Sequence, residues 1–139
     1  DQLKVRHLGS FADEWKKLTQ SDAVPYIGVG AVSTNLVEKH PEVVANVIAA
    51  LRDTLAWGKN HPDQVVSILE KSANLPEKDA KVYVSLWDSM NRVSLETADI
   101  DTLKREYTVF AENGLVKGKL NDDLFAVKPY ELSKKIVSK

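Results

Sequence analysis

Apolar residues recur at intervals of three and four through the centre of this chain. In the segment from Pro41 to Lys59 the apolar stripe is Val44, Ile48, Leu51 and Leu55. This spacing is typical of an amphipathic helix with one buried face. A shorter helix of the same kind is predicted to follow from Pro62 and to stop before Asn74. Because few residues separate the two helices, we expect them to pack together.

The phrase His-Pro-acid-x-Val-Val occurs at both His40 and His61. Proline suits the first helical position, because its missing N–H would have no partner there. The acid that follows lies where the helix dipole favours negative charge. Each copy therefore predicts a helix start. The repeat leaves open a helical solenoid, although such folds need at least about three repeats for stability.

Other segments show the same periodicity more briefly. A helix beginning at Thr97 or Asp99 is predicted to bury Ile100, Leu103, Tyr107 and Phe110 and to end at Asn113-Gly114, a typical left-handed stop. The remaining predicted helices are Phe11 to Leu18, Asn35 to Lys39, Pro76 to Met90 and Tyr130 to Val137. We expect about five to seven helices, with the one from Pro41 the longest or next to longest. Residues 1–10 are predicted to form a short extended segment.

The segment from Pro25 to Ser33, PYIGVGAVS, alternates instead with a period of two. The bulky residues Ile27, Val29 and Ala31 interleave with Tyr26, Gly28 and Gly30. This pattern predicts a strand with one bulky face and one face that leaves room for a backbone or a ligand. A strand needs a pairing partner, and an unpaired edge recruits another chain. We therefore predict a dimer through Pro25 to Ser33.

Composition excludes several functions. The chain has 139 residues, with 19 basic and 20 acidic side chains and a net charge of -1, so it has no field that would attract nucleic acid. It contains no cysteine, which excludes disulfides, thiolate nucleophiles and cysteine-bound zinc. No run reaches the roughly 18 apolar residues of a membrane span, and the first residues lack a signal-peptide profile.

Candidate chemical motifs each have a simpler structural explanation. Gly28 to Ser33 is similar to a dinucleotide fingerprint, but its third glycine is missing and no βαβ unit follows. His40 and His61 lack metal-ligand spacing, and the acids near Asp99 and Asp122 lie at predicted helix ends, where acids are common. We predict no catalytic residues, no metal and no cofactor, and hence no enzyme. The tryptophans are expected to pack in the core.

A resemblance appears when the phrases are taken in order. These are the PYIGVGAVST segment, then VEKHPEVV and NHPDQVV, and finally FAENGLVK with LNDDLF, spread over roughly Pro25 to Tyr130. They resemble the C-terminal portion of the solute-binding proteins of ABC importers for sulfonates, taurine, nitrate and thiamine precursors. The resemblance implies an α/β, mostly helical chain, the C-terminal part of a type II periplasmic-binding-protein fold with few strands. Residues 1–139 would then be a single domain, a fragment of a two-lobed protein.

The same resemblance implies a function. The chain is expected to be a periplasmic or extracytoplasmic component, or a fragment of one, that binds a small anionic or zwitterionic solute and delivers it to a membrane permease. Tyr26 and Gly28, on the roomy face of the predicted strand, are the candidate ligand-binding residues. The alternative is a free-standing helical domain whose exposed stripes bind a partner protein.

Overall fold

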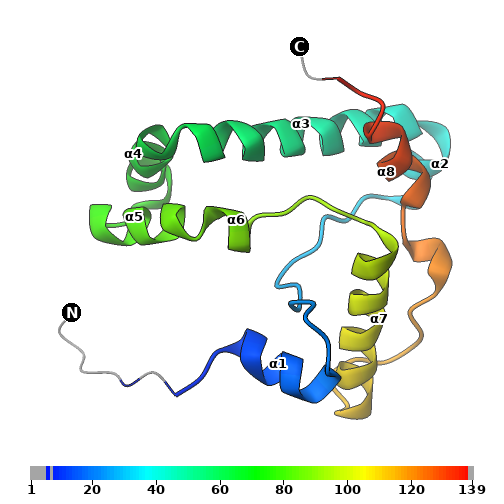
Figure 1. Ribbon diagram of the computed structural model, residues 1–139. Coiled ribbons are helices and arrows are strands. Elements are labelled where there is room, and N and C mark those ends of the chain that lie inside the picture. Colours follow the sequence, from blue (N-terminus) through cyan, green and yellow to red (C-terminus); the bar gives the residue numbers. More distant parts are fainter. Residues whose placement is uncertain (1–5, 7, 138–139) are drawn as a thin grey trace. The chain divides into compact units, whose positions relative to one another are not determined.

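The computed structural model describes residues 6 and 8–137, which form two compact units (Figure 1). Unit 1 contains residues 6, 8–31 and 95–125, and unit 2 contains residues 32–94 and 126–137. Each unit therefore combines segments that are distant in the sequence. Within the described chain, no helix is both long enough and apolar enough to cross a membrane.

Unit 2 is organised around α3 (Pro41–Asn60), which is 20 residues long and begins at the proline as predicted. The short helices α2 (Thr34–Lys39) and α8 (Val127–Ser133) both pack against it (Figure 1). Ala45 and Ala49 are buried on α3, so the helix has small side chains where other helices approach it. At the end of α8, the carbonyl of Ser133 accepts a hydrogen bond of 2.9 Å from Arg52 Nη2 on α3.

The rest of unit 2 is a second group of helices, α4 (Pro62–Ala73), α5 (Glu77–Ser85) and α6 (Trp87–Met90). The first of these begins at its proline and stops before Asn74, both as expected. Asn74 caps the end of the helix with a left-handed φ of 51°. It touches α3, but its main partner is α5. The predicted packing of the two His-Pro helices on each other is therefore only a minor contact.

Unit 1 contains α1 (Phe11–Thr19), α7 (Thr97–Glu112) and the 3₁₀ turn η1 (Asp122–Leu124). A reciprocal capping box starts α7, in which the Glu96 and Asp99 side chains each accept the other residue's backbone N–H. The helix ends at the predicted stop, where Gly114 has a φ of 70°. Arg105 Nη1 on α7 donates a 2.8 Å hydrogen bond to the carbonyl of Thr19, joining α7 to the end of α1.

The predicted strand from Pro25 to Ser33 is wrong. The chain is 66% helical, and no strand occurs among the described residues. Residues 27–32 are exposed, and no described backbone group pairs with them. Alternation of bulky and small residues favours an extended backbone, but a strand forms only against a partner, and the described residues supply none. The expected α/β class, as part of a type II periplasmic-binding fold, is thus corrected to a small all-helical fold.

Helix boundaries differ from the predictions in three places. The described residues form eight α-helices, more than expected, because the predicted helix from Pro76 to Met90 breaks at Leu86 into α5 and α6. The last helix begins at Val127, not Tyr130, because Pro129 fits within a first helical turn. The extended segment predicted for residues 1–10 falls largely on residues 1–5 and 7, which lie outside the described residues.

Buried faces also differ from the predicted stripes. On α3, Val44 is buried but Leu51 is 51% exposed, because the packed face is centred on the alanines. On α7 the buried positions are polar, and Phe110 on the predicted stripe is 43% exposed. Periodicity therefore located the helices more accurately than it located the sides on which they pack.

Candidate functional site

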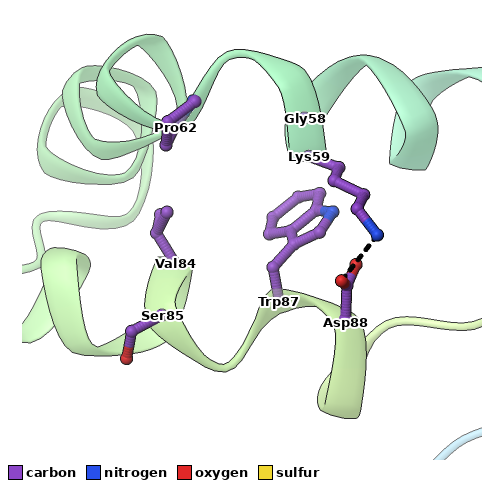
Figure 2. Close-up of a pocket in the computed structure, with 7 residues that line it drawn as sticks. All are labelled: Gly58, Lys59, Pro62, Val84, Ser85, Trp87 and Asp88. Atoms are coloured by element: carbon purple, nitrogen blue, oxygen red, sulfur yellow. Dashed lines mark ion pairs between the residues drawn. The ribbon is translucent and has the colours of Figure 1, made fainter.

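A pocket of about 260 Å³ lies within unit 2, where the end of α3 and the start of α4 meet α5 and α6 (Figure 2). Its lining residues are Gly58, Lys59, Pro62, Val84, Ser85, Trp87 and Asp88. We refer to it as the Trp87 pocket. The break at Leu86 is what forms it, because the chain changes direction there and Trp87 begins a new helix that faces α3.

The indole of Trp87 is held by a hydrogen bond and by shape. Its Nε1–H donates to the carbonyl of Leu55 at 3.0 Å. Gly58, which is buried, leaves the space that the ring occupies, and any β-carbon there would overlap the ring. A half-buried aromatic ring whose N–H is hydrogen-bonded has a fixed position. Trp87 therefore gives the pocket a fixed apolar surface.

Two oppositely charged side chains lie at the edge of the Trp87 pocket. Lys59 Nζ lies 2.7 Å from Asp88 Oδ2, and Figure 2 shows this ion pair beside the ring. The two side chains are 60% and 67% exposed, so water screens their attraction. An ammonium, a carboxylate and an aromatic face suit a small zwitterion, but contacts this exposed hold one only weakly.

Tyr26, a predicted ligand-binding residue, lies in unit 1 against α7. Its backbone N–H donates to a carboxylate oxygen of Glu106, and its phenol donates to Asp99 Oδ1. Both acids are buried, with exposures of 6% and 2%. Burial raises the pKa of Glu106 above its ordinary value, and the hydrogen bond from Tyr26 opposes that shift less strongly. Tyr26 thus anchors its segment to a helix.

The polar face of α7 is a feature that the apolar pattern missed. Asp99, Thr102 and Glu106 are all buried, and the hydroxyl of Thr102 donates to the carbonyl of Ala98 at 2.8 Å. Their spacing of three and four was the available signal, since it is the spacing of one helix face. Acids are seldom buried without partners, so their spacing alone does not indicate a buried face.

Gly28, the other predicted ligand-binding residue, is exposed, and a β-carbon there would meet no atom within 4 Å. It has no part in the Trp87 pocket, and neither has Tyr26. The structure brings Tyr26 together with two acids and leaves Gly28 apart from them. The ligand-binding role of both residues stays a prediction, as does the dimer through residues 25–33.

The other singled-out residues have local partners. His61 Nδ1–H donates to the carbonyl of Trp57 at 2.8 Å, and the two rings stack with centroids 4.7 Å apart. His40 Nδ1 lies 3.4 Å from Glu42 Oε1, and Asp122 forms an ion pair with Lys104. Asp99 lies in the first turn of α7 and Asp122 begins η1, so both acids lie at helix ends as predicted. No cluster of three metal-ligating side chains is present in the part of the chain that the structure describes.

Comparisons with family models, curated proteins and solved structures find no match for this chain.

Proposed function

We propose that this chain is part of the extracytoplasmic solute-binding component of an ABC importer for a small anionic or zwitterionic solute. The observation that carries the proposal is the order of the phrases VEKHPEVV, NHPDQVV, FAENGLVK and LNDDLF, which resembles that of such components. A membrane permease would be the protein partner. The proposal concerns the role of the chain and not its fold class.

The local structure of these phrases supports the proposal. The first two phrases start helices at Pro41 and Pro62, and the third ends α7 before Gly114. The fourth contains the 3₁₀ turn Asp122–Leu124. Each of the four phrases therefore lies at the boundary of a helix or turn. Such boundaries are expected if the resemblance extends to local structure.

The chain by itself is expected to bind solute poorly. Charge interactions are strong only where water is excluded, as when a ligand is enclosed on several sides. The Trp87 pocket has only one ion pair, and both its side chains are more than half exposed. We therefore propose that tight binding requires further polypeptide that encloses the solute together with this chain.

Calorimetry on two proteins tests this function. The 139-residue chain should bind taurine, nitrate and short sulfonates more weakly than micromolar, whereas a product of the whole reading frame should bind one of them tightly. Failure of the longer protein to bind any small anion or zwitterion would reject the transport function. Tight binding by the short chain would show that it already encloses the solute.

A helical protein-interaction domain remains the second candidate, and exposed apolar side chains favour it. Val43, Val47 and Leu51 recur every four residues on α3 and are 45%, 54% and 51% exposed. Side chains at this spacing form one stripe along a helix. The reading frame discriminates the two functions: a secretion signal and a long upstream segment favour transport, and an intracellular frame starting near Asp1 favours the interaction domain.

A further inference from the structure

A second pocket, of about 330 Å³, lies within unit 1 between α7 and the loop that follows it. Lys104, Tyr107 and Thr108 of α7 form one side, and the loop residues 118–121 form the other. We call it the α7 loop pocket. It shares no residue with the Trp87 pocket, and its lining carries two lysines and no acid.

Several hydrogen-bond donors of this pocket have no acceptor within the protein. The phenol of Tyr107 makes no hydrogen bond to another described residue, and neither do the backbone N–H groups of residues 116–121. Lys119 forms no ion pair with any described side chain. Thr108 is different, because its hydroxyl already donates to the carbonyl of Lys104 at 2.9 Å. The donors without an acceptor are thus the Lys119 ammonium, the Tyr107 phenol and the loop amides, while the Lys104 ammonium has one partner, Asp122.

Gly118 brings the loop close to Tyr107. Gly118 has a φ of 100°, in the region that favours glycine, and a β-carbon there would lie 3.9 Å from the Tyr107 hydroxyl oxygen. Backbone N–H groups of loops are common partners of bound anions. Gly118 therefore lets the loop, whose amides have no described acceptor, approach Tyr107.

One internal anion already lies beside the pocket. Asp122 Oδ1 is 2.6 Å from Lys104 Nζ, and the same ammonium lies 5.9 Å from the centre of the Phe125 ring. Asp122 is 80% exposed, whereas Lys104 is 40% exposed. The lysine is thus held by its surroundings, and the aspartate is the partner that can turn away into water. A stronger anion in the pocket would replace it.

We propose that the α7 loop pocket binds a small tetrahedral oxyanion, the phosphate or sulfonate group of a small solute. Ammonium groups and amide N–H groups form charge-assisted hydrogen bonds with such oxygens, about twice as strong as bonds between neutral groups. The inference goes beyond the transport function and does not depend on it, because it concerns unit 1 alone.

NMR titration of the amide signals tests the proposal, with inorganic phosphate and methanesulfonate as probes and with sodium chloride at equal ionic strength as the reference. We expect saturable shifts at Gly118, Lys119 and Leu120 with both probes and none with chloride. Shifts with phosphate alone would also support the pocket and identify the free anion as its ligand. Equal shifts with chloride, or none with either probe, would overturn the proposal.

Substitutions in and beside the α7 loop pocket should change phosphate affinity in opposite directions. Lys119→Ala and Tyr107→Phe should each weaken phosphate binding. Asp122→Asn should strengthen it by about two- to five-fold, the range expected when an exposed competing ion pair is removed. Lys71→Ala, at an exposed lysine of α4, is the matched control and should leave binding unchanged. If Lys119→Ala and Lys71→Ala lowered phosphate affinity equally, or if Asp122→Asn did not raise it, the binding would come from general charge attraction. Either result would reject the site.

Discussion

The Trp87 ring occupies the space that a side chain at Gly58 would fill. A β-carbon built on Gly58 would lie within 2.9 Å of the ring carbon Cη2 and still closer to its neighbour. The ring is fixed by its hydrogen bond to the carbonyl of Leu55, so it cannot easily move aside. This contact connects α3 with α6, and it makes a glycine necessary in the last turn of α3, although glycine is otherwise unfavourable within a helix.

Gly58→Ala is the first prediction. Alanine ordinarily stabilises a helix interior by about 1 kcal/mol relative to glycine. Overpacking against a fixed ring costs about 1–3 kcal/mol, so the net effect should be destabilising. Chemical denaturation measures the change.

The control is the same substitution made in a Trp87→Ala background, where the overlap is absent. There Gly58→Ala should be neutral or stabilising. An equal loss of stability in both backgrounds would mean that the ring contact is not the cause.

Arg52→Ala tests the attachment of α8 to α3. The guanidinium donates to the Ser133 carbonyl, and Ser133 is fully buried. Loss of a hydrogen bond to a charged group should lower the free energy of unfolding by about 1.5–3 kcal/mol. Amide exchange should accelerate first in α8. Lys59→Ala, which removes an exposed ion pair, is the comparison and should cost at most about 1 kcal/mol. Equal effects of the two substitutions would contradict this role.

Glu106→Gln tests the buried polar face of α7 through pH. Burial raises the pKa of Glu106 above 4.5, so the folded protein keeps this proton over a range in which the unfolded chain has released it. The contribution of Glu106 to stability therefore falls as the pH rises from the ordinary glutamate pKa through the raised pKa of the folded state. At higher pH the contribution is constant. The glutamine variant should lack this fall.

Denaturation of both proteins across that pH range provides the measurement. The stability of the variant relative to the wild type should increase with pH and then level off. Glu112→Gln, at an exposed position of the same helix, should give a curve parallel to the wild type. A parallel curve for Glu106→Gln as well would show that its carboxylate titrates normally.

Self-association through residues 25–33 is the fourth prediction. Ile27 and Val29 are 94% and 69% exposed, and the backbone of residues 27–32 has no hydrogen-bond partner among the described residues. Unpaired extended segments with apolar side chains recruit other chains. Sedimentation should show a concentration-dependent dimer that Val29→Lys weakens. Val82→Lys, at a 53% exposed valine of α5, should not weaken it. A monomer at high concentration would count against the interface.

Local sequence patterns were sufficient for most helix boundaries. The prolines at positions 41 and 62 start helices, α4 stops before Asn74, and the chain turns left-handed at Gly114, as predicted. These features depend on the backbone of a few neighbouring residues, namely a missing N–H in a first turn and a tolerated positive φ. Such preferences act within about one helical turn, so a single sequence contains the information needed to find them.

Packing decided everything that involves distant residues. The sequence by itself determined where α3, α4 and α7 begin and end, but only the tertiary structure decided that 25–33 is no strand, that α7 buries acids beneath Tyr26, and that Trp87 closes over Gly58. A strand depends on a pairing partner, and a buried carboxylate on a donor 73 or 80 residues away. Neither the pairing of a strand nor the burial of a carboxylate can be read from neighbouring residues. The stabilising free energy comes from the contact between distant residues and not from the preference of either residue alone.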